Sequence, residues 1–404
     1  MAESLRRTSE RMPRRSAADS KTILLTGGRA AATLELARLF HRGGHRVVIA
    51  ESFVAPLSDW SHAVAARYRV PRPLQEPAEF IASLIDIVRR EAVDLIVPTC
   101  EEVFHVAAAR DELSLHCDVF CESRARLRRV HSKYEFVQCA NEAGVAVPRT
   151  ERVVDRGALE ALVARRGLSL VLKPEFSRFG TNTILRPASA AQTSGIRVDA
   201  VRPWVAQDFV AGTPLCTWAA AHKGKLRAYS AYRVTQTAGG AAITFQHTPH
   251  PGAQAWVEGF VRHVEFTGQI AFDLIERGDG SVVGIECNPR ATSGVHLFRD
   301  DARMADAFLE HGSVEHELLA PGPGRFMLTL PMFTHGLSAV RSWGSLQNWA
   351  TTLRDSRSVL FDGSDPGPFL LQGLSFAELA ARAIAGHVDL LSASTLDIEW
   401  NGEE

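Results

Sequence analysis

Residues 270–291 read IAFDLIERGDGSVVGIECNPRA and are the most informative stretch of this 404-residue chain. Two apolar runs flank a turn with two glycines, a pattern that predicts an antiparallel hairpin. Glu286 and Asn288 are two residues apart, so their side chains leave the same face of the second strand. Asp273, across the hairpin, can point to that face as well. Two carboxylates and an amide on one surface suit Mg2+, which prefers hard oxygen ligands and also binds nucleotide phosphates.

Arg290 extends the same alternation beyond Asn288. Its guanidinium group offers a fork of N–H donors that matches a carboxylate or a phosphate. The alternative interpretation is an ordinary hairpin whose acidic side chains face solvent. The ordered run of Glu286, Asn288 and Arg290, downstream of an acid, favours a binding site over that alternative.

The first part of the chain alternates strands with helices, which predicts a parallel sheet covered on both faces. We expect strands at 22–27, 46–52 and 93–99, within a unit that spans residues 21–120. The turn after the first strand, Gly27-Gly28-Arg29, lacks the GxGxxG spacing of a dinucleotide site. A nicotinamide- or flavin-binding domain with Glu51 as the ribose acid is therefore the disfavoured alternative.

The rest of the chain predicts mixed α and β structure. A small α/β stretch covers 150–212, antiparallel strands follow over 217–248, and a helix over 253–266 precedes the hairpin. Pro321-Gly322-Pro323-Gly324 marks a boundary. The fold class is thus α/β and α+β, multidomain: a basic tail at 1–20, a parallel domain at 21–120, a larger domain at 121–320 and a small mixed C-terminal subdomain at 321–404.

This pattern resembles the ATP-grasp superfamily and is similar to the carboxylate–amine ligases and the ATP-binding halves of carbamoyl-phosphate synthetase. The resemblance covers about residues 21–320. It implies a pre-ATP-grasp domain at 21–120, which in the family usually binds no nucleotide, and an ATP-grasp domain with a lid subdomain at about 150–212 and an antiparallel core. ATP and Mg2+ are the implied cofactors, with Mn2+ as a substitute. The implied metal ligands are Asp273, Glu286 and Asn288.

Two lysines gain roles from this resemblance. Lysine occurs five times among the 45 basic residues, and an ammonium point charge is not interchangeable with a guanidinium fork. Lys133, in HSKYEF, and Lys173, in VLKP, match the family's two nucleotide-binding lysines, and Lys173 is also given a catalytic role. Ser177, Gly180 and Thr181 follow in a segment that resembles the phosphate-covering loop.

The stretch VAQDFVAGT, residues 205–213, matches the hinge strand whose backbone reads adenine. The family often has a ribose-binding acid just after the Gly-Thr pair, where this chain has Pro214. Either Asp208 or Thr213 takes its place, or the ribose is held less tightly. The residues expected beside the nucleotide are Gln207, Asp208, Phe209, Val210 and Thr213.

The acceptor side of the site is less defined. The resemblance gives Arg290 a catalytic role on the reacting carboxylate or acyl phosphate. Arg233 is a second candidate for binding a carboxylate, the alternative being a surface charge on a strand. Glu101 and Glu102 follow the strand at 93–99, where an amine contact is less favoured than a first-turn helix role. The other residues expected to line the substrate pocket are Ser293, Gly294 and His296.

The implied function is an ATP-dependent carboxylate–amine ligase that forms an amide or peptide bond through an acyl phosphate and releases ADP and phosphate. Its substrates would be a small carboxylic acid, such as an amino acid, and an amine. The alternatives are a bicarbonate- or carbamate-phosphorylating enzyme, or a nucleotide-binding regulatory protein without turnover. The chain is too short for a synthetase with two ATP-grasp halves.

Composition limits the partners. A net charge of −1 and 46% hydrophobic residues argue against nucleic-acid coating and against extensive disorder. The sequence has no run of 18 consecutive apolar residues, so we expect no membrane-spanning helix. Six cysteines without a CxxC pair suit a cytoplasmic protein with free thiols, and zinc at Cys117 and Cys121 or at His247 and His250 is disfavoured. A homodimer is the commonest oligomer and is the state we expect.

Overall fold

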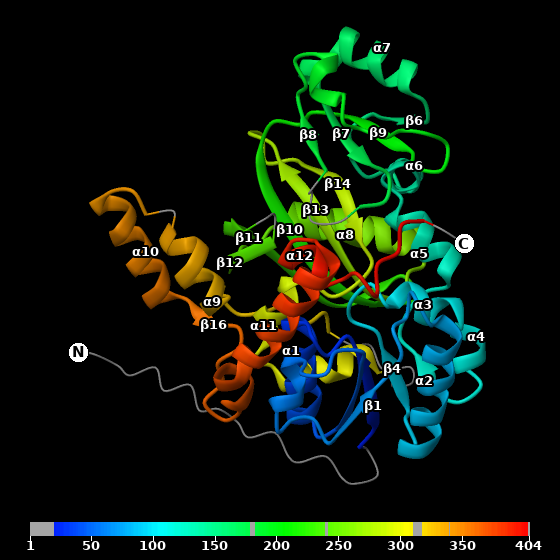
Figure 1. The fold of residues 1–404 in the computed structure, drawn as a ribbon, viewed down its shortest axis with the longest axis vertical. Coiled ribbons are helices and arrows are strands. Elements are labelled where there is room, and N and C mark those ends of the chain that lie inside the picture. The colour runs from blue at the N-terminus through cyan, green and yellow to red at the C-terminus, as the bar shows by residue number, and fades with distance from the viewer. Residues whose placement is uncertain (1–19, 178–181, 239–240, 310–316, 339, 403–404) are drawn as a thin grey trace.

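The backbone of this protein builds three β-sheets. The computed structural model describes residues 20–177, 182–238, 241–309, 317–338 and 340–402. Figure 1 shows the sheets as tiers, with a parallel sheet at the bottom, a large sheet in the middle and a small antiparallel sheet at the top. This arrangement confirms the expected α/β and α+β fold class.

The first sheet is parallel, with the strand order β3-β2-β1-β4-β5. Its central strand β1 is buried on both faces, because Ile23 and Leu25 pack with helix α1 while Leu24 packs with helix α2. The chain then turns at Gly27, where φ is +76° and a Cβ atom would lie 2.7 Å from Thr99 Oγ1, so a side chain does not fit. The elements of this unit are β1 (Thr22–Thr26), α1 (Ala31–Arg42), β2 (Arg46–Glu51), η2 (Leu57–Trp60), β3 (Ala66–Arg69), α2 (Pro77–Glu91), β4 (Leu95–Val97), α3 (Val103–Ala108), α4 (Arg110–Leu113) and β5 (Asp118–Val119).

The small sheet is antiparallel throughout, with the order β6-β9-β7-β8. Helix α7 covers it, and Leu159 and Leu162 of that helix pack with Leu172 and Trp204 of the sheet. Helices α5 (Arg124–His131) and α6 (Lys133–Glu142) connect it to the first unit. Its elements are β6 (Thr150–Val153), α7 (Arg156–Arg166), η3 (Gly167–Ser169), β7 (Leu170–Pro174), β8 (Ile184–Leu185), η4 (Ala190–Thr193) and β9 (Trp204–Asp208).

The large sheet has seven strands in the order β14-β13-β10-β11-β12-β15-β16. Its last two strands come from beyond residue 321, so the C-terminal region extends this sheet instead of forming one of its own. All neighbouring strands are antiparallel except β15 and β16. The strands are β10 (Thr213–His222), β11 (Lys225–Ala238), β12 (Ala241–His247), β13 (Gly268–Glu276), β14 (Val282–Asn288), β15 (Arg325–Met327) and β16 (Arg357–Ser358).

The two faces of the large sheet are covered differently. Helix α8 (Pro251–His263) covers one face, where Phe260 meets Phe272 edge-on at 5.1 Å. His250 is the N-cap of α8, because its Nδ1 accepts the Ala253 N–H at 3.0 Å. The opposite face packs against the short helices η5 (Ser293–Phe298) and η6 (Ala302–Phe308), with Trp218 meeting Phe298 at 5.6 Å.

A buried ionic cluster joins the first unit to the large sheet. Glu35 of α1 has no exposed surface, and its carboxylate accepts hydrogen bonds from Arg299 at 2.6 Å and lies 3.1 Å from His296 Nδ1. The Arg299 guanidinium also donates to backbone carbonyls of residues 358–361. Although burial opposes ionisation, Arg299 and His296 hold the pKa of Glu35 below its usual value.

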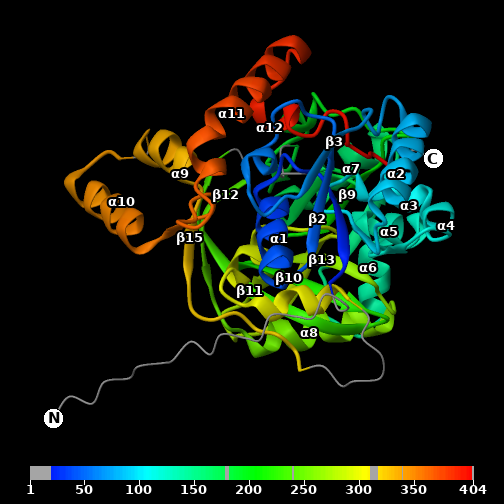
Figure 2. The ribbon, with the colours of Figure 1, turned by 90° about the horizontal axis from the view of Figure 1, so that it is seen from below.

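The end of the chain returns to the first unit. Helix α11 (Gly367–Gly386) and helix α12 (Leu390–Ala393) lie beside it (Figures 1 and 2). Asp397 then binds Arg29 at 2.5 Å, and Trp400 stacks on Phe104 with ring centroids 4.5 Å apart. Trp400 also meets Phe176 edge-on at 5.4 Å, which places the C-terminal residues beside the chain segment that follows Lys173.

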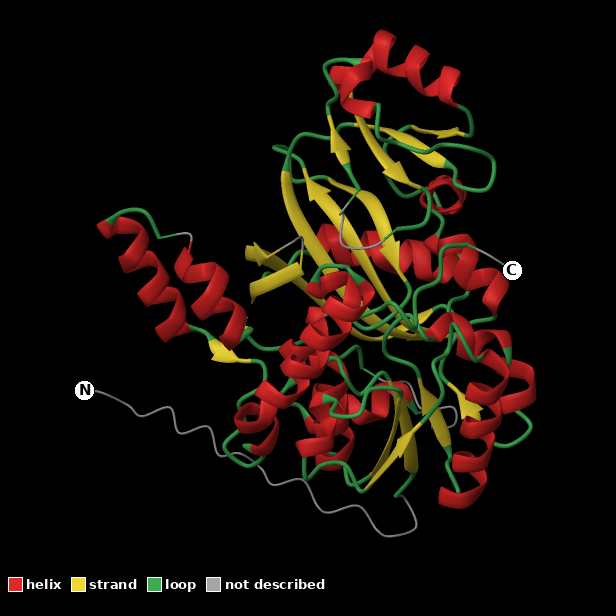
Figure 3. Cartoon of the chain, viewed as in Figure 1, coloured by secondary structure: helices red, strands yellow, loops and turns green. Residues whose placement is uncertain are grey.

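A helical arm leaves the large sheet between β15 and β16. It comprises α9 (Thr329–Pro331), the π-helical turn η7 (Met332–Gly336) and α10 (Trp343–Asp355), and none of the α10 residues is buried. Figures 1 and 3 show the arm projecting away from the sheets. Within the described part of the chain, we find no helix with the length and apolar character needed to cross a membrane.

The Glu35 cluster makes a stability prediction. Glu35→Ala leaves the Arg299 guanidinium buried without its main counter-charge, so we expect the free energy of unfolding to fall by about 3 to 5 kcal/mol. Because the pKa of Glu35 is depressed, its contribution is present at neutral pH and disappears only at strongly acidic pH. Urea denaturation at pH 7 measures the loss.

Glu160→Ala is the matched control, because Glu160 forms an exposed i,i+4 pair with Arg156. We expect it to change stability by less than about 0.5 kcal/mol. If Glu35→Ala were no more damaging than Glu160→Ala, the cluster would not join the two units energetically.

Candidate active site

Strands β13 and β14 bring the three predicted metal ligands together. Asp273 pairs directly with Glu286 across the hairpin, so both side chains leave the same face of the sheet. Asn288 follows two residues after Glu286 and donates from Nδ2 to Asp273 Oδ2 at 3.4 Å. Cys216 of β10, opposite Asp273, donates from Sγ to Asp273 Oδ1 at 3.2 Å. The three oxygen-bearing groups therefore form one surface at the edge of the large sheet.

The two predicted nucleotide-binding lysines approach this surface from other elements. Lys133 opens helix α6 and is 2% exposed, and its Nζ lies 3.6 Å from Glu286 Oε1 and donates to the Ser177 carbonyl at 3.0 Å. Lys173 of β7 is also buried and donates from Nζ to Gln207 Oε1 of the neighbouring strand β9 at 3.1 Å. Thus α6, the small sheet and the large sheet each contribute charge to one place.

Burial controls the protonation of these groups. Desolvation lowers the pKa of Lys173, and the charge of Lys133 lowers it further, while Glu286 and Asp273 act in the opposite direction. Desolvation also raises the pKa of Asp273, to which the negative charge of Glu286 adds. Both pKa shifts indicate that the protein compensates the charges of Lys173 and Asp273 only in part. Binding of further charged groups would therefore stabilise the site.

Arg290 lies beside the same surface. Its side chain donates to Asn288 Oδ1 at 3.4 Å, and its Nε lies 3.6 Å from Glu101 Oε1. Glu101 is 2% exposed and follows β4, at the carboxyl edge of the first sheet. Glu102 has a different environment, because its Oε1 accepts the backbone N–H groups of Thr99 and Cys100 and so closes the turn after β4. Of these two glutamates, Glu101 is the one beside the site.

The segment after Lys173 is anchored at its start. The Glu175 carboxylate is completely buried and accepts hydrogen bonds from Ser132 Oγ and from Arg152 Nε, both at 2.6 Å. Ser177 contributes its carbonyl to Lys133. Gly180 and Thr181, predicted for the phosphate-covering loop, lie outside the described residues.

The predicted hinge strand ends beside the site, with its side chains already engaged. Gln207 links Lys173 to Thr150, donating from Nε2 to the Thr150 hydroxyl at 3.3 Å. The Asp208 carboxylate is bound by Arg166 of α7. The remaining hinge residues are partly or largely exposed: Phe209, under the guanidinium of Arg186 at 5.2 Å, Val210, and Thr213 at the start of β10.

Arg233 lies apart from the other predicted substrate residues. It sits on β11 next to Tyr232, which faces the same way as Cys216 and Asp273, so strand alternation directs Arg233 to the α8 side of the sheet. There it binds Glu276, the last residue of β13. This geometry corrects the expectation that Arg233 binds the substrate carboxylate. Arg233 forms an ion pair with Glu276 on the face of the sheet opposite to Asp273.

The residues after Arg290 also differ from expectation. His296 is 3% exposed and belongs to the Glu35 cluster, and burial lowers its pKa. A Cβ atom on Gly294 would lie 2.5 Å from Trp218 Cβ, so this glycine permits η5 to pack on the sheet. Gly294 and His296 are therefore packing and joining residues instead of pocket lining, while Ser293 is half-buried at the start of η5.

Two residues that shape the site, Cys216 and Glu175, could not be identified from the sequence. Cys216 reaches Asp273 only because β10 pairs with β13 in one register, and no local motif marks it. Glu175 lies at the start of the segment that resembles the phosphate-covering loop, yet its carboxylate holds α6 and β6 through Ser132 and Arg152. A buried ion pair between distant segments leaves no local signature in sequence.

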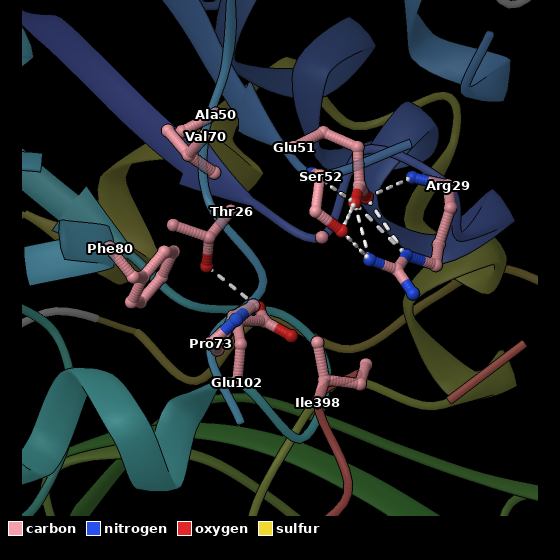
Figure 4. A pocket seen from close by; sticks show the side chains of 11 residues that line it. Thr26, Arg29, Ala50, Glu51, Ser52, Val70, Pro73, Phe80, Glu102 and Ile398 are labelled. Atoms are coloured by element: carbon pink, nitrogen blue, oxygen red, sulfur yellow. Dashed lines mark hydrogen bonds and ion pairs between the residues drawn. The ribbon is translucent and has the colours of Figure 1, made fainter. Parts of the chain in front are cut away.

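At the carboxyl edge of the first sheet, where open α/β sheets bind ligands, the space around Arg29 is nearly filled. Figure 4 shows Arg29 bound to Glu51 there, with Ser52 and Ile398 beside them. Asp397 binds the same guanidinium at 2.5 Å. The cavity beneath these side chains has a volume of about 10 Å3, enough for one water molecule. A separate, open pocket of about 390 Å3 adjoins it and is lined by Ser52, Val70 and Arg72.

The chemistry of the donor set fits a hard cation and a polyphosphate. Within the described residues, no three His, Cys, Asp or Glu side chains form a complete metal cage. Two carboxylates and an amide leave coordination positions for phosphate oxygens and water, which is how proteins usually bind Mg2+. The two buried ammonium groups beside them suit phosphate oxygens.

No protein-family model matches the chain, and no curated protein matches it in sequence. Solved structures do match. An N5-carboxyaminoimidazole synthetase from Staphylococcus aureus aligns with a TM-score of 0.60 and 13% identity over 79% of this chain and 85% of that one. An L-amino acid ligase from Bacillus licheniformis aligns with a TM-score of 0.57 and 15% identity over 75% and 79%.

A third structure is the biotin carboxylase domain of 2-oxoglutarate carboxylase from Hydrogenobacter thermophilus, in complex with MgADP, ADP and bicarbonate. It aligns with a TM-score of 0.57 and 11% identity over 76% of this chain and 73% of that one. All three are ATP-grasp enzymes. Identities this low establish the fold alone, and the chain accordingly has the ATP-grasp fold.

Proposed function

We propose that this chain is an ATP-dependent carboxylate–amine ligase that uses Mg2+ and releases ADP and phosphate. The observation that supports it most is the convergence of Lys133, Lys173 and Glu286 from three separate elements, with Lys133 Nζ 3.6 Å from Glu286 Oε1. A structural ion pair would need one cation for one anion. Two buried lysines beside two carboxylates and an amide instead suit a bound magnesium–nucleotide complex.

Each group has a task in this proposal. Lys133 and Lys173 neutralise phosphate oxygens of ATP, and the end of β9 borders the adenine. Asp273, Glu286 and Asn288 hold Mg2+, which, when bound, draws charge from the phosphate oxygens and orients the γ-phosphoryl group. Arg290 is held by Asn288 and Glu101. It binds the carboxylate substrate and stabilises the negative charge that develops during phosphoryl transfer.

The reaction needs activation because a carboxylate is a poor electrophile. Transfer of the γ-phosphoryl group to the carboxylate oxygen yields an acyl phosphate and ADP. An amine then attacks the acyl carbon, phosphate leaves, and the amine loses a proton as the amide forms. The protein contributes position and charge compensation. We infer that the small sheet, which carries Lys173, acts as a lid that excludes water from the acyl phosphate.

Bicarbonate is the second candidate for the phosphorylated acid. The domain from Hydrogenobacter thermophilus was solved with bicarbonate. The enzyme from Staphylococcus aureus is named as a synthetase of a carboxyamino compound. ADP formation measured with bicarbonate, or with pooled amino acids in bicarbonate-free buffer, separates the two candidates. We expect amino acids or other small carboxylic acids to stimulate turnover more than bicarbonate does.

We expect Lys173→Ala to lower kcat for ADP formation by about a hundredfold or more. One lost electrostatic contact to the transition state costs about 3 kcal/mol. Lys225→Ala, which removes an exposed lysine at the start of β11, is the matched control and should retain wild-type turnover. Circular dichroism verifies that both variants fold, and turnover by Lys173→Ala near the wild-type rate would refute the assignment.

A second pair of variants tests the two faces of the hairpin. Glu286→Gln removes a carboxylate from the proposed Mg2+ surface, so we expect turnover to collapse and its dependence on Mg2+ concentration to shift upward. Glu276→Gln removes a carboxylate of the same hairpin that binds Arg233 and faces α8. It should leave turnover and Mg2+ dependence unchanged. Equal losses in both variants would contradict the placement of the site.

A further inference from the structure

Helix α11 carries an unpaired apolar stripe on its outer side. The stripe consists of Leu370, Leu374, Ala377, Ala381 and Ile384, which recur at alternating intervals of four and three residues. This is the spacing at which one helix packs along another. All five residues are exposed, and Leu370 and Ile384 are 72% and 75% exposed.

The inner side of α11 is occupied by the first unit. The Glu378 carboxylate accepts the backbone N–H groups of Val54 and Ala55, and Ser375 Oγ donates to the Ala55 carbonyl at 2.6 Å. Arg382 lies over the ring of Phe53 at 3.9 Å. Glu378 and Arg382 are the only charged residues of the helix, so the outer stripe has no charge of its own.

Exposed apolar side chains concentrate in this region of the chain. Of the 20 large hydrophobic residues that are exposed in the described structure, 12 lie beyond residue 321, which is about a fifth of the chain. A contiguous apolar stripe on the solvent side of a helix is normally covered by a partner. Figure 2 shows α11 extending past the first unit, with its outer side reachable by another molecule.

We propose that a second copy of this chain covers the stripe, with the two α11 helices antiparallel about a twofold axis at Ala377. In that arrangement Leu370 meets the partner's Ile384 and Leu374 meets the partner's Ala381, while Ala377 meets its own copy. Large residues then face each other at the ends, and small residues allow close approach at the centre. The stripe is thus complementary to itself, as a twofold interface requires.

Other occupants fit less well. Residues 1–19 of the same chain are rich in arginine and polar residues, which would place charge on an uncharged stripe. Helices that lie on membranes carry basic residues beside their apolar face, and α11 has none there. A stripe about 21 Å long belongs to the small-interface class, so we expect dissociation in the micromolar range.

The test uses opposite charges at the proposed axis. Ala377→Glu and Ala377→Lys each place like charges against each other in the pair, so each variant alone should be monomeric by sedimentation where the wild type is dimeric. A one-to-one mixture of the two should regain the dimer. Ala108→Glu, at an exposed alanine on α3, should remain dimeric.

Cysteine crosslinking tests the direction of the helices. Ala377→Cys should form a disulfide with its own copy under mild oxidation, whereas Leu370→Cys should not, because antiparallel copies of residue 370 are about 20 Å apart. A wild type that is monomeric up to about 1 mM, a mixture that does not regain the dimer, or crosslinking of Leu370→Cys to itself would each overturn the proposal.

Discussion

The site depends on the compensation of two carboxylates, Asp273 and Glu286, that one hairpin holds side by side. Burial, and after it the negative charge of Glu286, raises the pKa of Asp273, and Lys133 comes within 3.6 Å of Glu286 from another element. Lys173, from the small sheet, is the second positive charge beside these carboxylates, and its burial there lowers its pKa. Such an arrangement is most favourable when a magnesium–polyphosphate ligand bridges the opposite charges, and this is the physical basis of the proposed function.

The scaffold keeps these elements in register through buried ionic contacts between distant segments. Glu35 and Arg299 join the first unit to the large sheet, and Glu175 ties α6 to the small sheet through Ser132 and Arg152. The C-terminal residues return to bind Arg29 and to pack Trp400 beside the segment after Lys173. The last part of the chain is therefore integrated with the first unit and with the large sheet.

The parts of this account that could be predicted from sequence are those with local periodicity. Strand alternation predicts that Glu286 and Asn288 share a face, and the resemblance to ATP-grasp enzymes distinguishes Lys133 and Lys173 among the five lysines. Sequence could not place Arg233 or His296, because a side chain's partner depends on strand pairing and on the packing of α1 against η5. Long-range ion pairs and the joining of β15 and β16 to the large sheet are tertiary properties without a local pattern.

The most direct test of the central claim is product analysis with Mg2+, ATP and pooled carboxylic acids in the presence of hydroxylamine. The account predicts ADP, phosphate and a hydroxamate of one acid, because hydroxylamine intercepts an acyl phosphate. AMP and pyrophosphate would instead reveal an adenylate intermediate and would contradict the role assigned to Lys133, Lys173 and the Asp273–Glu286 pair.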